Sequence, residues 1–169
     1  MSSISRELQM TLQSAYREAV HRRHAYLTVE HLLFALLHDE RGIEILRHSG
    51  ARPEILKSGL ERFFVDDLEQ VPGEEPVDTQ QTLAFHRVLQ HAMDHAEGAE
   101  KEEVDVGDLL VAIYQEPDSY AVTLLRSQDV TQLDILRYIS HGESKLRDGS
   151  GPGEEAGATK SGPTLVREC

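Results

Sequence analysis

The stretch "AYLTVEHLLFALL", Ala25 to Leu37, has a near counterpart further along the chain, "EEVDVGDLLVAIY", Glu102 to Tyr114. In each stretch one polar residue stands directly before a dense apolar run, Thr28 in the first and Asp105 in the second. A Thr or Asp side chain at this place accepts a hydrogen bond from a free backbone N–H of the first helical turn. Both stretches therefore predict a short, largely buried helix, and the offset between them is 105 − 28 = 77 residues.

The sequence on either side of the two stretches repeats in the same order. A segment with apolar residues at helical spacing precedes each one, Ile4 to Val20 in the first case and Leu83 to Ala96 in the second. Behind them "ILRHSGA" aligns with "LLRSQDV" after a two-residue shift, and further helices begin at Pro53 and Thr131. The chain is therefore predicted to be all-α, with about eight helices in two tandem four-helix repeats at about 4–64 and 78–140. One such unit has too little interior to be stable, so we expect the two to pack face to face around one core.

Two segments do not carry the helical pattern. The stretch "VDDLEQVPGEEPVDTQQ", residues 65–81, has six acidic residues, two prolines and no Lys or Arg, which is typical of a solvated linker. The stretch beyond Gly142 is rich in Gly, Pro, Ser and Thr and cannot bury enough apolar surface to order itself. We therefore expect one domain over residues 1–142, with an acidic linker at 65–77, followed by a disordered tail at 143–169.

Composition narrows the classes of partner and compartment. The 169 residues carry a formal net charge of −13, which disfavours binding to the phosphate backbone of a nucleic acid. The one cysteine, Cys169, permits no internal disulfide and so favours a reducing compartment, the cytoplasm. Neither a run of about 18 apolar residues nor a secretory signal occurs, so we expect no membrane span.

No motif for catalysis or nucleotide binding is present. The sequence has no GxxxxGK phosphate loop, no GxSxG elbow and no HExxH, and Cys169 has no base to orient it. His91 and His95 are spaced to hold one ion together, but two ligands fall short of the three or four that a zinc site needs. We expect both to be solvated, and the basic run "HRRH", His21 to His24, to stabilise the end of a helix. The sequence thus predicts no enzyme, no metal and no cofactor, and a stand-alone helical metal-binding protein remains the rival from another class.

The two repeats differ at two adjacent positions. Glu30 in the first corresponds to Gly107 in the second, and His31 corresponds to Asp108. An acid in the first turn of a helix ordinarily stabilises the helix dipole. These differences nonetheless fall around the loop and helix start at 24–31, which we interpret as a polar surface where the duplication is asymmetric. A partner that binds once per domain needs such an asymmetry.

Four segments together carry a family resemblance: "LTVEHLLFALL", "DTQQTLAFHRVLQHAM", "DVGDLLVAIY" and "DILRYISHG". Over roughly Ile4 to Gly142 the chain resembles the amino-terminal domains of Clp-family AAA+ ATPases. "TVEHLLFALL" is shared across these domains, whereas "TLAFHRVLQ" and "YISHG" point to the ClpA type, with the ClpC type as the alternative. The resemblance implies an eight-helix domain with pseudo-twofold symmetry and no catalysis of its own, which docks adaptors and substrates for unfolding and degradation.

The resemblance also implies partners and contact residues. In ClpA-type ATPases this domain binds the small adaptor ClpS and helps to engage protein substrates, while the parent chain forms a hexamer and docks the ClpP peptidase. Matched residue by residue, the adaptor-binding positions are Glu30 within "TVEH", and Thr82 and Arg87 within "TLAFHRV". A further acidic contact of the family is replaced here by Ala25.

Overall fold

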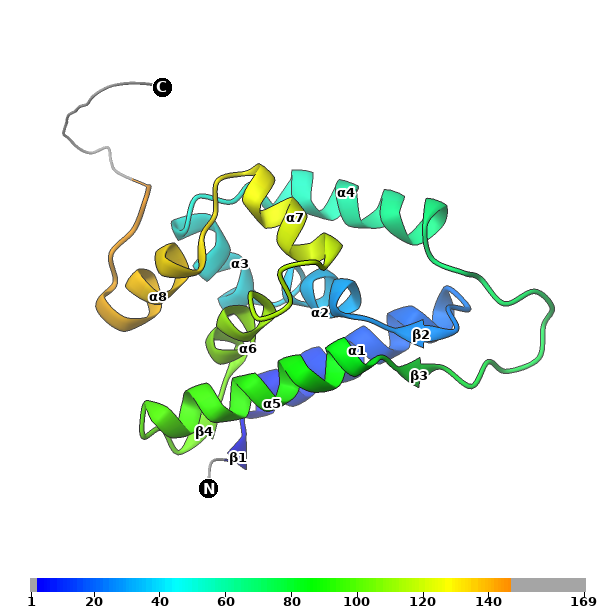
Figure 1. The fold of residues 1–169 in the computed structure, drawn as a ribbon, viewed down its shortest axis with the longest axis horizontal. Coiled ribbons are helices and arrows are strands. Elements are labelled where there is room, and N and C mark those ends of the chain that lie inside the picture. The colour runs from blue at the N-terminus through cyan, green and yellow to red at the C-terminus, as the bar shows by residue number, and fades with distance from the viewer. Residues whose placement is uncertain (1–2, 147–169) are drawn as a thin grey trace.

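The computed structural model describes residues 3–146 and confirms the predicted all-α class. Among these residues none of the helices combines the length and the hydrophobicity that crossing a membrane requires. Eight helices form within the described part of the chain, four in each predicted repeat (Figure 1). They are α1 (Arg6–His21), α2 (Val29–Leu36), α3 (Glu40–His48), α4 (Pro53–Asp66), α5 (Leu83–Gly98), α6 (Val106–Ile113), α7 (Tyr120–Ser127) and α8 (Gln132–His141).

Several helices begin at residues whose side chains cap them, although the Thr28 hydroxyl does not accept the backbone hydrogen bond that the sequence predicted for α2. The Ser5 hydroxyl accepts a hydrogen bond from the backbone N–H of Leu8 at 3.1 Å, at the start of α1. At the start of α8, Asp134 N–H donates to the Thr131 hydroxyl at 3.1 Å, and Thr131 N–H donates to the Asp134 carboxylate at 2.9 Å. Pro53 occupies the first turn of α4, where its missing N–H has no cost. These contacts satisfy backbone groups that a helix leaves free at its start.

Within residues 3–146, four strands of two residues each were not predicted. They are β1 (Ser3–Ile4), β2 (Tyr26–Leu27), β3 (Gln80–Gln81) and β4 (Glu103–Val104), and they pair in parallel, β1 with β4 and β2 with β3. The 77-residue offset carries β1 onto β3 and β2 onto β4, so the duplication makes the two pairs equivalent. Each pair joins a strand of one repeat to a strand of the other. The repeats therefore interlock in addition to packing face to face.

Helices α2 and α6 form the centre of the molecule. Every residue of both helices is buried, including two acids, Glu30 and Asp108. Helix α1 packs on α2 and α5 on α6, and α6 also contacts α8 of its own half (Figure 1). Across the two halves α2 contacts α7, and α6 contacts α3. The equivalent leucine pairs of the two predicted apolar runs, at 32–33 and 109–110, are completely buried. Each such leucine contributes about 1.5–3 kcal/mol by leaving water.

The chain turns at corresponding points in the two halves. After α1, Arg23 has a φ of 59°, and after α5, Glu100 has a φ of 57°, at an offset of 100 − 23 = 77 residues. This left-handed conformation is unfavourable for a residue with a side chain, so the packing around both turns must hold it. After α3, Gly50 has a φ of 101°, and it matches Asp129 at 60° after α7 with the two-residue shift. Gly50 follows the end of α3 at His48, where glycine adopts a positive φ without strain.

The two irregular segments are tied to the helices at specific points. In the linker, Val71 N–H donates to the carbonyl of Arg23 at 2.8 Å, and Arg23 Nε donates to the carbonyl of Val71 at 2.9 Å. Beyond α8, Lys145 N–H donates to the carbonyl of His48 at 2.7 Å, and the Ser144 hydroxyl lies 2.7 Å from His48 Nδ1. These contacts continue beyond the predicted domain end at 142. The remainder of the predicted tail, 147–169, lies outside the described residues.

Candidate functional site

A groove of about 440 Å³ lies between α1 and α5, at the end of the molecule where β2 and β3 pair. Its apolar lining comes from both repeats and consists of Leu12, Tyr16, Leu27, Phe85 and Leu89. Leu12 and Leu89 are equivalent residues of the two repeats, since 89 − 12 = 77. The groove therefore lies near the pseudo-twofold axis that relates the repeats. A concave and mainly apolar site of this size is suited to the side chains of a bound peptide.

Large apolar side chains remain exposed at the same end of the molecule. Tyr16 is 48% exposed, Tyr26 of β2 is 52% exposed, and Leu83, the first residue of α5, is 76% exposed. A partner that covers these side chains gains about 25 cal/mol for each Å² of apolar surface removed from water. The groove and these three residues at its end therefore form the strongest docking surface in the described part of the chain.

A larger hollow, of about 640 Å³, lies beside α8. Its lining is charged and includes Asp134, Arg137, Glu143 and Lys145. Lys145 already pairs with Asp134 at 2.9 Å. This hollow offers little apolar surface to a peptide, so the α1–α5 groove is the better candidate.

Two of the predicted adaptor-binding residues lie at the start of α5. The Thr82 hydroxyl caps this helix, because it accepts a hydrogen bond from Phe85 N–H at 3.1 Å. The Arg87 side chain is 55% exposed and donates two hydrogen bonds to the Glu116 carboxylate, both at 2.8 Å. These hydrogen bonds lower the pKa of Glu116 and raise that of Arg87. Arg87 is thus an oriented cation on a helix that borders the groove.

The third predicted residue, Glu30, has a role that the sequence did not indicate. Its side chain is only 6% exposed, and its Oε2 accepts a hydrogen bond from the backbone N–H of Ala121 at 3.0 Å. Ala121 lies in the first turn of α7, so Glu30 caps a helix of the other repeat. The expectation that Glu30 faces outward from its helix start is wrong. Its burial removes it from the surface that carries Arg87.

Gly107, the counterpart of Glu30, is also buried. A Cβ atom at this glycine would lie 3.2 Å from Asp105 Oδ1 and 3.5 Å from the Ile139 side chain in α8. The difference between Glu30 and Gly107 therefore reflects what each helix start packs against in the interior. The prediction of an asymmetric polar surface at these positions is wrong, because neither residue lies on the surface.

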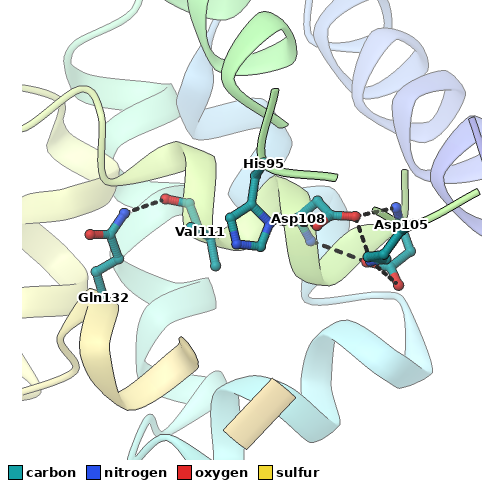
Figure 2. Close-up of polar contacts among 6 residues, drawn as sticks. His95, Asp105, Asp108, Val111 and Gln132 are labelled. Carbon is teal, nitrogen blue, oxygen red and sulfur yellow. Dashed lines mark hydrogen bonds and ion pairs between the residues drawn. The ribbon is translucent and has the colours of Figure 1, made fainter. Parts of the chain in front are cut away.

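Asp108 is buried and closes the start of its own helix. Figure 2 shows it between His95 and Asp105. Asp108 Oδ2 accepts a hydrogen bond from Asp105 N–H at 2.9 Å, while its Oδ1 lies 2.6 Å from His95 Nδ1. Lys101 adds an ion pair with Asp108 at 2.7 Å. His95 therefore belongs to a partly buried polar network and is not the solvated residue that the sequence predicted.

In the first repeat two buried histidines take the places of the Lys101–Asp108 ion pair, at the same 77-residue offset. His31 Nδ1 accepts a hydrogen bond from Thr28 N–H at 2.9 Å, and His31 Nε2 lies 2.8 Å from His24 Nδ1. His24 Nε2 lies 3.2 Å from the carbonyl of Phe64. In this series of hydrogen bonds every donor meets an acceptor when both histidine rings are neutral and carry their hydrogen on Nε2. Burial lowers the pKa of His31 to about 3 and also lowers the pKa of His24.

Sequence reasoning missed both the groove and the histidine pair. Tyr16 and Phe85 have the same helical spacing as core residues, so no feature of the sequence separates groove lining from interior. The histidine pair did leave a signal. At the equivalent positions of the second repeat both histidines are changed, His24 to a lysine and His31 to an aspartate. Two positions that change together are typical of residues in contact.

The histidine spacing that suggested a metal ion leads to no such site in the described structure. Within residues 3–146 no group of three or more His, Cys, Asp or Glu side chains is placed to hold one ion. His95, one of the two candidate ligands, already contacts the Asp108 carboxylate. The geometry therefore lends no support to the metal-binding alternative.

Comparison with known sequences extends over both repeats. The sequence pattern of the family described as "Clp repeat (R) N-terminal domain" matches residues 3–128. A curated relative, "ClpA homolog protein" from Fuscovulum blasticum, is 36% identical over 147 residues. The match covers 85% of this chain but 18% of the relative, so the chain spans less than a fifth of that relative's length.

Solved structures share the fold at lower sequence identity. The N-terminal domain of Hsp104 from Candida albicans superposes with a TM-score of 0.69 at 14% identity, over 85% of this chain and 94% of that one. A ClpV N-domain in complex with a VipB peptide superposes with a TM-score of 0.64 at 17% identity, over 86% of this chain and 91% of that one. At these identities the likeness shows a common fold.

Proposed function

Because the chain belongs to the Clp repeat (R) N-terminal domain family, we propose that it is the docking domain of a larger Clp-type ATPase. The domain has no catalytic role of its own and holds adaptors and substrates close to an ATP-driven unfolding machine. The parent protein forms a hexamer in the cytoplasm and passes substrates to the ClpP peptidase. The segments "TLAFHRVLQ" and "YISHG" favour the ClpA type over the ClpC type, and the 36% identity to a ClpA homolog supports this choice.

The α1–α5 groove is the observation that carries the proposal. Polypeptides that require unfolding expose apolar segments, and a groove lined by Leu12, Tyr16 and Phe85 offers such segments a place to bury. A ClpV N-domain of the same fold has been solved in complex with a VipB peptide, which supports peptide binding as a use of this fold.

For the ClpS adaptor we propose the exposed start of α5. Leu83 supplies an apolar anchor there and Arg87 an oriented cation, while Thr82 holds the helix start in place. Ala25 lacks the acidic side chain of the family, and its carbonyl accepts a hydrogen bond from Gln80 N–H at 3.0 Å. The adaptor contact in this proposal therefore relies on α5 and not on residue 25 or the buried Glu30.

Calorimetric titration of the 169-residue chain with ClpS from the same organism tests the adaptor site. Leu83→Ser and Arg87→Gln should each weaken binding about tenfold, as expected for anchor residues of an interface. The matched control is Leu133→Ser, which removes a leucine that is 53% exposed in the first turn of α8. Unchanged affinity in all three variants would place the adaptor elsewhere, and equal losses in all three would indicate a general loss of folding.

A further inference from the structure

The two ends of the α1–α5 helix pair carry opposite charges at equivalent positions. Helix α1 runs from β1 to β2 and α5 runs from β3 to β4, and the pairing of β1 with β4 and β2 with β3 makes the two helices antiparallel (Figure 1). Arg17, near the end of α1, lines the groove at the β2–β3 end. The equivalent residue near the end of α5 is Asp94, since 94 − 17 = 77, and it lies toward the β1–β4 end. The two repeats thus share this helix but carry opposite charges at the equivalent position.

Arg17 has no acidic partner within the described structure. No carboxylate of residues 3–146 lies within ion-pair distance of its guanidinium, whereas Arg22 is held by Glu18 at 2.6 Å. Acidic residues outnumber basic ones by 30 to 17 in this chain, so carboxylates that could pair with an arginine are plentiful. Arg17 nevertheless has none beside it and is available to pair with a carboxylate of a partner. Arg17 also lines two adjoining hollows, of about 550 and 370 Å³, so it stands where three depressions meet.

We propose that the groove takes an apolar peptide segment in one direction, with an acidic side chain of the peptide bound to Arg17. This inference rests on the proposed function of the groove as a docking site for polypeptides. A guanidinium binds a carboxylate through two parallel hydrogen bonds, and apolar surroundings reduce the screening of that pair by water. The amides of Gln13 and Gln81, which also line the groove, are suited to hydrogen bonds with the main chain of the peptide.

The opposite end of the helix pair disfavours the reverse orientation. There the Asp94 carboxylate, which accepts a hydrogen bond from Gln90 at 3.1 Å, would face an acidic side chain of a reversed peptide. Like charges across an interface lower affinity, and specificity for one orientation follows from attraction at one end and repulsion at the other.

Fluorescence anisotropy with two matched probes tests the charge preference. The first probe is the tightest acidic binder from an array of twelve-residue peptides of equal apolar content, and the second is its Asp-to-Asn twin. The Arg17→Gln variant should bind the acidic probe about fivefold more weakly, the upper range for a partly exposed ion pair, and should bind the amide twin as the parent does. Arg62→Gln removes another exposed arginine, on α4, and should change neither affinity.

Tyr16→Ser separates failure of this inference from failure of the docking function, because it should weaken both probes alike. If the parent bound the two probes equally, or if Arg17→Gln weakened both, the acidic preference would be refuted while the groove remained a docking site. If no peptide of the array bound, or if Tyr16→Ser changed neither probe, the docking groove itself would be refuted. Circular dichroism of each variant establishes that it is folded.

The direction of binding has its own test. Adding Asp94→Arg to the Arg17→Gln variant moves the cation to the other end of the helix pair. This double variant should recover the preference for the acidic probe at least in part, because the peptide then binds in the reverse orientation. A double variant that shows no preference would refute the directional part of the proposal.

Discussion

His31 and Asp108 close equivalent helix starts with different side chains. His31 accepts a hydrogen bond from Thr28 N–H at 2.9 Å, and Asp108 accepts one from Asp105 N–H at 2.9 Å. Asp108 does so with a negative charge, whereas His31 does so only while its Nδ1 carries no proton. The first repeat therefore depends on a neutral imidazole where the second depends on a carboxylate.

The buried histidines should make the domain sensitive to acid. Burial holds the folded-state pKa of His31 at about 3 and lowers that of His24, while both titrate near 6.5 when the chain is unfolded. As the pH falls below about 6.5, protons bind preferentially to the unfolded chain, and the free energy of unfolding falls by up to about 1.4 kcal/mol per pH unit for each histidine. This stability is fully present above pH 6.5 and, for His31, is lost progressively down to about pH 3. Urea unfolding at a series of pH values from 7.5 to 5 measures the slope.

The second repeat supplies the control for this prediction. A double variant, His24→Lys with His31→Asp, places the lysine and aspartate of the second repeat at the equivalent positions of the first. The loss of stability between pH 6.5 and 5 should be smaller in this variant, because neither new side chain has an ordinary pKa in that range. A folded variant with the same slope as the parent would mean that other groups cause the acid sensitivity.

Glu30 should matter for stability through its hydrogen bond to Ala121 N–H. Glu30→Ala leaves that buried donor without an acceptor and should lower the free energy of unfolding by about 1–3 kcal/mol. Glu30→Gln keeps an acceptor oxygen and should cost less, whereas Glu30→Lys buries a cation and should cost more. Urea unfolding ranks the three variants, and equal stability of Glu30→Ala and the parent would refute the capping role.

At the scale of the helices, much of the fold could be predicted from the sequence. The caps at Ser5 and Thr131 and the buried runs of α2 and α6 are local features, because a capping residue and an apolar run lie next to each other in the chain. The 77-residue offset added the duplication. Local patterns and their repetition were therefore sufficient for the helix order and the shared core.

The features that were missed depend on contacts between the repeats. The strands have two residues each, too few for a periodic pattern, and exist because each finds a partner in the other repeat. From the sequence alone, Glu30 has the pattern of an exposed acid in a first helical turn, because its partner in α7 is distant in the chain. The groove forms only where α1 and α5 lie side by side. Of the predicted site residues, Arg87 lies on an exposed part of α5, but its pairing with Glu116, 29 residues further along, could not be read from the local pattern.

Two glycines at helix positions should respond oppositely to the same substitution. Nothing lies within 4 Å of a Cβ atom at Gly98 in α5, so Gly98→Ala should raise the free energy of unfolding by about 0.5–1 kcal/mol through helix propensity. At Gly107 the new methyl group would lie 3.2 Å from Asp105 Oδ1, which is held by its hydrogen bond to Asp108 N–H. Gly107→Ala should therefore lower stability. Thermal unfolding of both variants measures whether each substitution raises or lowers stability. If both raised it, the Asp105 side chain at the start of α6 would have to shift without a loss of free energy.

At the scale of the whole molecule, the interlocked repeats should fold only together. Fragments 1–73 and 74–169 each lack the partners of their own strands and half of the shared core. Each fragment alone should show little helical circular dichroism, and an equimolar mixture should recover the signal, because the break at Gly73 falls in the exposed linker. A cooperative melting transition in either fragment alone would contradict this prediction.

The pairing of β1 with β4 also delays folding during synthesis, because β4 is made long after β1. Ser3 pairs with Glu103, so 103 − 3 = 100 residues of translation separate a strand from its partner. At about 5–20 residues per second, the amino-terminal strand waits on the ribosome for about 5–20 s before its partner is made. During that time α1 and α2 have emerged with their apolar faces uncovered, and the nascent chain is exposed to aggregation and to ribosome-associated chaperones. The domain thus passes through part of its own synthesis in a partly folded state with apolar surface exposed.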